Sequence, residues 1–84
     1  MATDFMALTK EQLLGALHNR LGLDVGAIDD ETPLFSSGLI DSFSLVELIA
    51  FIETQAGFRI EPMDVSLENL DSVGRILRFA NQPR

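Results

Sequence analysis

Hydrophobic residues near the N-terminus recur every three or four positions, which is the spacing of one face of an α-helix. These apolar positions are Leu13, Leu14, Leu17 and Leu21. Just ahead of them, Thr9 and Gln12 have the spacing of a capping box, in which each side chain binds the backbone N–H of the other residue. Gly22 follows, where a helix commonly ends in a left-handed residue. The pattern predicts a helix over residues 10–21.

A second helical pattern occupies the middle of the chain. Its apolar positions are Phe43, Val46, Leu48, Ile49, Ile52 and Ala56. Either Asp41 or Ser42 can accept a hydrogen bond from the free N–H groups of the first turn, and Gly57 ends the pattern. We therefore expect a helix over residues 42–56, with its N-terminal cap left open between these two side chains.

Two shorter helical patterns lie closer to the C-terminus. Pro62 suits the first position of a helix, and we expect a short third helix over residues 62–67. Asp71 or Ser72 can cap a last helix over residues 72–80. The apolar positions of that helix are Val73, Ile76, Leu77 and Ala80.

Residues 22–40 form a long connection between the first two predicted helices. A connection of this length is unusual in a compact domain unless it packs through its own side chains. We expect Ile28, Leu34 and Phe35 to anchor it on the core. The elements together predict an all-α fold: a small four-helix bundle with a long first loop and a short third helix, forming a single domain over residues 1–84.

Composition narrows the class of protein. Of the 84 residues, 46% are hydrophobic, which is ordinary for a globular domain. The absence of cysteine excludes a disulfide framework, a thiolate zinc site and a cysteine nucleophile. No apolar stretch approaches the length of a membrane span, and residues 1–5 lack the pattern of a signal peptide. We expect a cytoplasmic protein that does not enter membranes.

The charge is strongly negative and unevenly distributed. A formal net charge of −7 disfavours binding to nucleic acid or to an anionic membrane surface. Residues 24–71 hold eleven acidic residues and one basic residue, Arg59. Two interpretations stay open here: a surface for a basic partner, and a charge excess that aids solubility.

The most informative segment is residues 38–43, with the sequence Gly-Leu-Ile-Asp-Ser-Phe, at the start of the second predicted helix. A serine at a helix N-terminus projects into solvent, and the partial positive charge there favours an attached anion. With the acidity, the helix order and the long first loop, this segment resembles the attachment site of acyl carrier proteins. The resemblance covers nearly the whole chain. It implies that Ser42 carries 4′-phosphopantetheine, taken from coenzyme A, through a phosphodiester.

The resemblance also implies roles for the residues around Ser42. Asp41 would serve recognition or metal contact during the modification. The acidic side chains that would bind basic patches of partner enzymes are Asp41, Glu47 and Glu53. The apolar docking contacts would be Phe43 and Leu48. The residues that would line the core or a pocket for an attached chain are Val46, Ile49, Ile52, Ile60 and Leu77.

The same resemblance implies the partners. They are a phosphopantetheinyl transferase, a ligase that loads an acyl or aminoacyl group, and downstream acyl-transfer enzymes. The chain would be a monomeric carrier rather than an enzyme, with no metal of its own. The prosthetic group would bring the thiol that a chain without cysteine lacks.

Other interpretations of the serine are weaker. A hydrolase nucleophile needs a base and an oxyanion hole, but His18 is the only histidine and no Gly-x-Ser-x-Gly elbow occurs. Ser72 also follows an aspartate but lacks the preceding Gly-Leu-Ile, and Ser44 has no aspartate before it. If Ser42 is only a helix cap, the chain is a non-modified acidic helical adaptor for a basic partner.

The cargo stays open between two kinds. Leu45 stands where fatty-acid carriers commonly have a small polar residue, and Thr54 and Gln55 stand where acids often occur. The Gly-Leu-Ile-Asp-Ser-Phe form also resembles stand-alone D-alanyl and aminoacyl carriers. The sequence thus allows a fatty-acyl or polyketide type of cargo and a dedicated aminoacyl or D-alanyl type.

Overall fold

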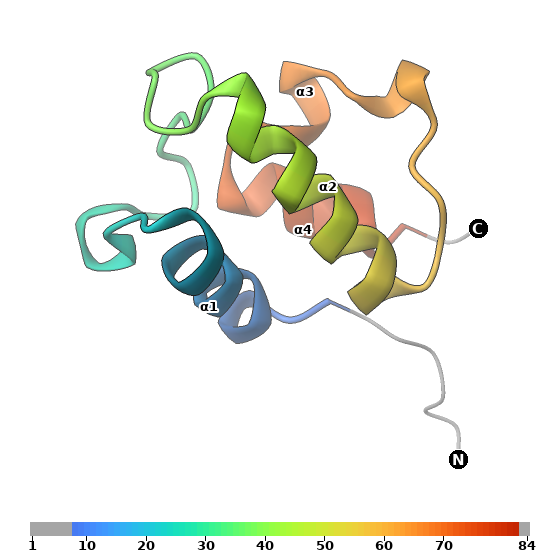
Figure 1. Ribbon diagram of the computed structural model, residues 1–84, viewed down its shortest axis with the longest axis horizontal. Coiled ribbons are helices and arrows are strands. Elements are labelled where there is room, and N and C mark those ends of the chain that lie inside the picture. The colour runs from blue at the N-terminus through green and yellow to red at the C-terminus, as the bar shows by residue number, and fades with distance from the viewer. Residues whose placement is uncertain (1–7, 83–84) are drawn as a thin grey trace.

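The computed structural model describes residues 8–82, and these residues contain helices and no strand (Figure 1). The α-helices are α1 (Lys10–Leu21), α2 (Ser42–Ala56), α3 (Leu67–Leu70) and α4 (Val73–Ala80). Two 3₁₀ turns, η1 (Val25–Ala27) and η2 (Pro62–Asp64), lie in the connections before α2 and α3. The expected fold class, a small four-helix bundle with a long first loop, is confirmed.

Local signals in the sequence explain how α1 and α2 end. The backbone nitrogen of Gln12 lies 3.1 Å from Thr9 Oγ1, and that of Thr9 lies 3.0 Å from Gln12 Oε1, which completes the capping box. Gly22 and Gly57 end the two helices in the left-handed conformation, with φ of 72° and 79°. Glycine adopts this conformation without the steric cost that a Cβ would add.

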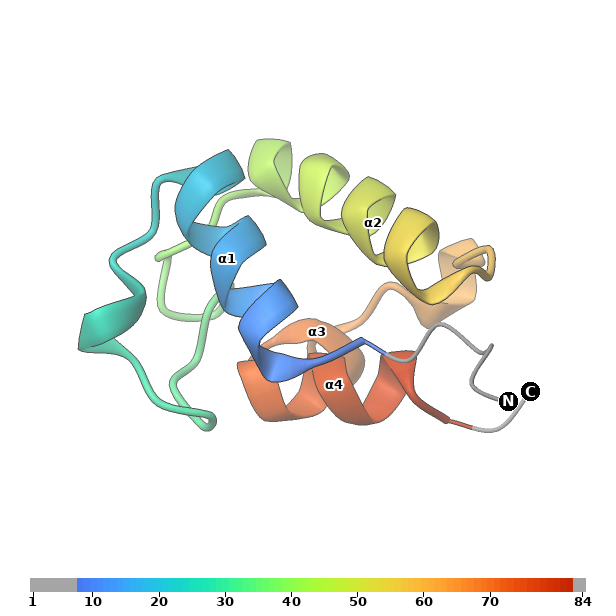
Figure 2. The same ribbon diagram turned by 90° about the horizontal axis from the view of Figure 1, so that it is seen from below.

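The helices enclose one hydrophobic core. α1 packs against both α2 and α4, and α3 packs against α4. Figure 2 shows α2 and α4 on opposite sides of that core. The largest fully buried side chains are Leu13, Leu17, Leu34, Leu48, Ile52, Leu70, Val73 and Ile76. Leu34 belongs to the long connection, and Ile28 and Phe35 pack half-buried beside the core, so the connection is anchored as expected.

A carboxylate from a distant part of the chain holds this connection in place. Asp71, which follows α3, accepts hydrogen bonds from the backbone N–H groups of Phe35 and Ser36 at 2.7 and 3.0 Å. It also accepts one from the Ser36 hydroxyl at 2.7 Å. The Asp71 carbonyl accepts a further bond from the Leu34 N–H at 2.7 Å. Together these bonds fix the loop from which α2, and with it Ser42, departs.

The hydrogen bonds to Asp71 also set its ionisation. Burial raises the pKa of Asp71, but hydrogen bonds from the N–H and hydroxyl of Ser36, and from Phe35, outweigh burial. The pKa therefore lies below its ordinary value, and the side chain is a charged acceptor at neutral pH.

The third helix differs from the expectation over residues 62–67. Pro62 begins only the turn η2, and α3 begins separately at Leu67. Ser66 separates the two because its backbone is extended, with φ −145° and ψ 161°, and its hydroxyl caps α3 at the N–H of Asn69. Serine favours such caps over helix interiors, which is why the helix starts after it.

The last helix begins at Val73, one position later than expected, for the same reason. Ser72 has an extended backbone, with φ −153° and ψ 163°, and its hydroxyl accepts a hydrogen bond from the Arg75 N–H at 3.1 Å. Ser72 is therefore the N-terminal cap of α4, and it is only 5% exposed.

The orientation of α2 corrects two expectations. Leu48 and Ile52 are 2% and 0% exposed, whereas Val46 is 68% exposed. Val46 and Leu48 are two positions apart, about 200° around the helix, so they cannot both face the core. Val46 is thus not a core residue, and Leu48 is not on a docking surface. The other expected core positions, Ile49, Ile60 and Leu77, are buried or pack against the buried cluster.

Replacing Ile52 with alanine should lower the free energy of unfolding by about 3 kcal/mol, because it opens a cavity in the core. Val46→Ala, on the same helix, removes an exposed side chain and should change that free energy by less than about 0.5 kcal/mol. Urea unfolding followed by circular dichroism measures both. Equal losses in the two variants would contradict this orientation of α2.

Asp71→Ala should lower the free energy of unfolding by about 1–2 kcal/mol, because it removes three hydrogen bonds from a partly exposed carboxylate. Asp71→Asn keeps one acceptor oxygen and should cost less. Because the folded-state pKa is lowered, the contribution of Asp71 is present above its ordinary pKa of about 4 and is lost as the pH falls below it.

Urea unfolding at a series of pH values tests this contribution. The stability of Asp71→Ala should fall less on acidification than that of the unmodified chain. Glu31→Ala, which removes an exposed carboxylate from the same long connection, is the control and should leave the acid dependence nearly unchanged. An identical acid dependence in Asp71→Ala and the unmodified chain would count against the role of Asp71.

Candidate functional site

Ser42 is the first residue of α2, and its side chain is exposed. The adjacent Asp41 is the helix cap: its carboxylate accepts a hydrogen bond from the Ser44 N–H at 2.8 Å, and its carbonyl accepts one from the Leu45 N–H at 3.1 Å. The sequence left the cap open between Asp41 and Ser42, and the structure assigns it to Asp41. The Ser42 hydroxyl forms no hydrogen bond with any other residue in the described range 8–82.

The start of α2 suits an attached phosphate. The partial positive charge of the helix N-terminus lies beside the Ser42 hydroxyl and favours an anion there. Hydrogen bonds from the N–H and then the hydroxyl of Ser44 hold the pKa of Asp41 below its ordinary value. Asp41 is therefore negatively charged and would repel a phosphodiester on the neighbouring serine. Its contribution to the site is structural, because it caps the start of α2. An exposed, unbonded hydroxyl at this helix end fits 4′-phosphopantetheine.

A groove opens beside Ser42 between the start of α2, the loop before it and α3. Its volume is about 460 Å³. The residues that line it are Phe35, Gly38, Ile40, Asp41, Ser42, Leu45, Val65, Ser66, Leu67 and Leu70. Most of these side chains are apolar, so the groove can receive an apolar group that starts at Ser42.

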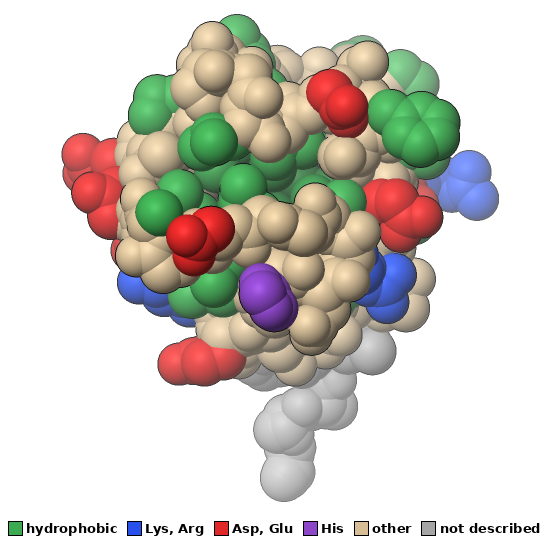
Figure 3. Space-filling view, turned by 60° about the vertical axis from the view of Figure 1, so that its left-hand side comes forward, with side chains coloured by type: hydrophobic (Ala, Val, Ile, Leu, Met, Phe, Trp, Pro, Cys, Tyr) green, Lys and Arg blue, Asp and Glu red, His purple; other side chains and the backbone are tan. Residues whose placement is uncertain are grey.

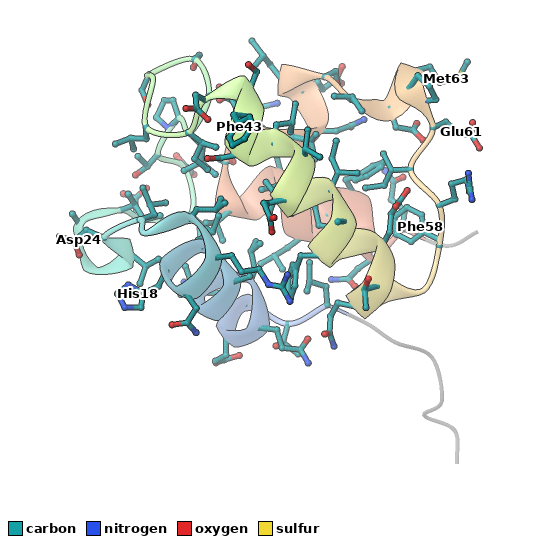
Figure 4. The ribbon with its side chains drawn as sticks, viewed as in Figure 1. His18, Asp24, Phe43, Phe58, Glu61 and Met63 are labelled. Carbon is teal, nitrogen blue, oxygen red and sulfur yellow. The ribbon has the colours of Figure 1, made fainter. Side chains whose placement is uncertain are left out.

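Exposed apolar side chains lie close to the serine. Phe43, the next residue, is 85% exposed, and Figure 4 shows it on the outer side of α2. Leu39, in the loop before α2, is 47% exposed. The face in Figure 3 carries hydrophobic side chains at the surface among scattered acidic ones. Phe43 therefore has the exposure that a docking contact needs.

Two of the acidic docking residues expected from the resemblance, Glu47 and Glu53, differ in their exposure and in the groups they contact. Glu47 is exposed and its Oε1 lies 3.9 Å from Arg20 Nη1 of α1. Glu53 is half-buried and accepts a hydrogen bond from the Ile60 N–H at 2.7 Å, which ties the end of α2 to the segment after it. Glu53 thus acts within the fold.

Sequence reasoning missed the contribution of Asp71 to this site. The sequence suggests it only as a cap of the last helix, whereas Ser72 provides that cap and Asp71 holds the loop that leads to Ser42. No local pattern predicts this, because the groups that bind Asp71 belong to a segment far away in the chain.

The other candidates for chemistry do not assemble into a site. His18 Nδ1 lies 3.2 Å from the carbonyl oxygen of Leu23, and Figure 4 shows His18 well apart from Phe43 and the start of α2. Ser72 is buried as a cap. In the part of the chain that the structure describes, no group of three or more His, Asp or Glu side chains could hold a metal ion. None of the helices described is long and apolar enough to cross a membrane.

Known proteins similar to this chain are carrier proteins. The chain is 29% identical over 73 residues to a D-alanyl carrier protein of Abiotrophia defectiva, covering 87% of this chain and 92% of that one. It is 31% identical over 69 residues to an acyl carrier protein of Saccharopolyspora erythraea, covering 82% and 70% respectively. No solved structure matches it significantly. Residues 11–80 match the family described as "Phosphopantetheine attachment site", so the chain belongs to this family of carriers with covalently attached 4′-phosphopantetheine.

Proposed function

We propose that Ser42 is the residue that bears the 4′-phosphopantetheine of this carrier. The observation that carries the proposal is that Asp41 caps α2, which leaves the neighbouring hydroxyl exposed and unused. Ser72, the other serine that follows an aspartate, is buried and its hydroxyl is engaged with Arg75. The position of Ser42 at a helix N-terminus supports the same assignment, because an anion is favoured there.

In the proposed attachment, Ser42 Oγ bonds to the phosphorus that bears pantetheine in coenzyme A. The bond from that phosphorus to the nucleotide part of coenzyme A breaks, and the nucleotide leaves. The Ser42 proton passes to a base of the transferase, because Asp41, the adjacent carboxylate, already accepts hydrogen bonds from Ser44. The chain contributes a nucleophile at an accessible, well-defined position.

The attached group supplies the thiol on which an acyl or aminoacyl group is held as a thioester. We infer that the chain itself carries rather than catalyses, since its contribution lies in positioning. Asp41 holds the start of α2, and Asp71 holds the loop before it. His18, the only histidine, lies in the last turn of α1, where its Nδ1 is 3.2 Å from the carbonyl oxygen of Leu23.

Intact mass spectrometry tests the attachment site. Incubation with coenzyme A and a broad-specificity phosphopantetheinyl transferase should add the mass of one phosphopantetheine to the unmodified chain. Ser42→Ala should gain nothing, because the nucleophile is gone. Ser72→Ala should still gain the full mass, although loss of the cap costs about 1 kcal/mol of stability.

Two results would contradict the assignment. A mass gain in Ser42→Ala would place the arm on another residue. No gain in the unmodified chain, under conditions that modify a known carrier, would favour the non-modified acidic adaptor instead.

We propose that the groove beside Ser42 receives the apolar part of the cargo. Its volume of about 460 Å³ lies within the range of small-ligand pockets. Leu45, Val65 and Leu70 line it, and Asp41 is the charged residue among its lining. The apolar side chains of the lining suit an acyl chain, because its burial there removes apolar surface from water. The matched relatives include one D-alanyl and one acyl carrier, so the groove is what favours the acyl type.

Thermal melting of loaded carriers tests this role of the groove. An octanoyl thioester should raise the melting temperature of the phosphopantetheine-bearing protein by a few degrees, because the acyl chain binds only the folded state. A D-alanyl thioester should raise it less, since a methyl group buries little apolar surface. Equal melting temperatures for the two loaded forms would speak against the groove as an acyl site.

Carrier proteins work with transferases and with enzymes that handle acyl groups. For this chain we propose a phosphopantetheinyl transferase, a loading ligase and downstream acyl-transfer enzymes as partners. The expected cytoplasmic location and monomeric state stay predictions from the sequence.

A further inference from the structure

The groove beside Ser42 has two walls that come from distant parts of the chain. The loop wall is the segment 34–40, and its lining residues are Phe35, Gly38 and Ile40. The α3 wall is the segment 65–70, and its lining residues are Val65, Ser66, Leu67 and Leu70. The separation of these two walls sets the width of the space that an attached acyl chain can enter.

The loop wall is held together by its own hydrogen bonds. The Leu34 carbonyl accepts a hydrogen bond from the Ile40 N–H at 2.9 Å, and the Phe35 carbonyl accepts one from the Gly38 N–H at 3.1 Å. Leu34 and Ile40 are also buried in the core. A movement at the start of this wall therefore carries its groove-lining residues with it.

Asp71 joins the loop wall to the α3 wall. Its N–H donates to the Leu67 carbonyl at 3.0 Å, so its backbone continues the end of α3. Its Oδ1 accepts the N–H groups of Phe35 and Ser36 at 2.7 and 3.0 Å, and its Oδ2 accepts the Ser36 hydroxyl at 2.7 Å. The Asp71 carbonyl accepts the Leu34 N–H at 2.7 Å. Asp71 is not part of the groove lining, so it acts on the groove only through the walls.

The α3 wall has further supports that do not involve the loop. Arg75 of α4 donates to the Glu68 carbonyl at 3.1 Å, and the Asn69 amide donates to the Asp64 carbonyl at 2.9 Å. Leu70 is 2% exposed and packs in the core. Loss of the Asp71 carboxylate would therefore release mainly the loop wall.

We propose that the Asp71 carboxylate keeps the groove narrow and thereby makes it select straight acyl chains over branched ones. The proposal rests on the groove being the acyl site, as proposed above. Walls that are tied together cannot separate freely, so a wider group must displace packed side chains, which costs free energy. Asp71 is a positioning residue, because it holds the walls and does not touch the cargo.

The test compares two isomeric cargoes, octanoyl and 2-propylpentanoyl, each loaded on Ser42 from its coenzyme A thioester by the transferase. The isomers contain the same atoms, so a difference between their melting temperatures reports shape more than apolar area. With Asp71 intact, the octanoyl form should melt about 3 °C above the branched form. In Asp71→Ala this difference should fall below about 1 °C, because the loop wall can yield to the branch.

Two further variants separate selectivity from stability. Asp71→Asn keeps Oδ1 for both backbone N–H groups and should retain a difference of about 2 °C or more. Thr9→Ala removes the cap of α1, outside the groove lining. It should lower the melting temperatures of both loaded forms by a few degrees and leave the difference between them at about 3 °C.

The outcomes distinguish this proposal from the acyl site on which it rests. If octanoyl raises the melting temperature but the isomer difference is the same in Asp71→Ala, or is absent with Asp71 intact, the role of Asp71 is overturned and the acyl site stands. Loss of the difference in Thr9→Ala as well would overturn it too, since any loss of stability would then have the same effect. If neither thioester raises the melting temperature with Asp71 intact, the acyl site itself is rejected and this proposal with it.

Discussion

The carboxylate of Asp71 accepts hydrogen bonds from two backbone N–H groups and one hydroxyl of the loop that precedes α2. The loop is long and contains several glycines, so ordering it costs conformational entropy, which these hydrogen bonds help to offset. Because Leu34 of the same loop is fully buried in the core, polar and apolar contacts fix the loop together. The position of Ser42 depends on this anchoring, since α2 starts directly after the loop.

Asp41 and Ser42 are neighbours at the start of α2, but only Asp41 caps the helix, so the Ser42 hydroxyl stays exposed. Asp41 accepts a hydrogen bond from a backbone N–H of the first turn of α2, as helix N-termini require, and the Ser42 hydroxyl is not needed for that cap. The groove beside it adds an apolar space of about 460 Å³. A carrier needs little more from its protein part, because the reactive thiol comes with the prosthetic group.

The net charge of the chain does not show which acidic side chains are free to meet a partner. The formal charge of −7 suggests an acidic docking face, and the resemblance implies one along α2. Within the fold, however, Glu53 binds a backbone N–H and Glu47 lies beside Arg20. Next to Ser42, exposed Asp41 and exposed Phe43 stand side by side in the chain, so the surface there is both acidic and apolar.

The sequence by itself determined the ends of α1 and α2 and the all-helical class, because caps, glycines and apolar spacing act within a few residues. The candidate serine came from the resemblance of residues 38–43 to the attachment site of acyl carrier proteins. The sequence did not determine that Ser66 would separate η2 from α3, since Pro62 and Ser66 give competing local signals. Only the tertiary structure decided which of Val46 and Leu48 faces the core, and that Asp71 holds the loop. Those choices depend on contacts between segments far apart in the chain, which no local pattern records.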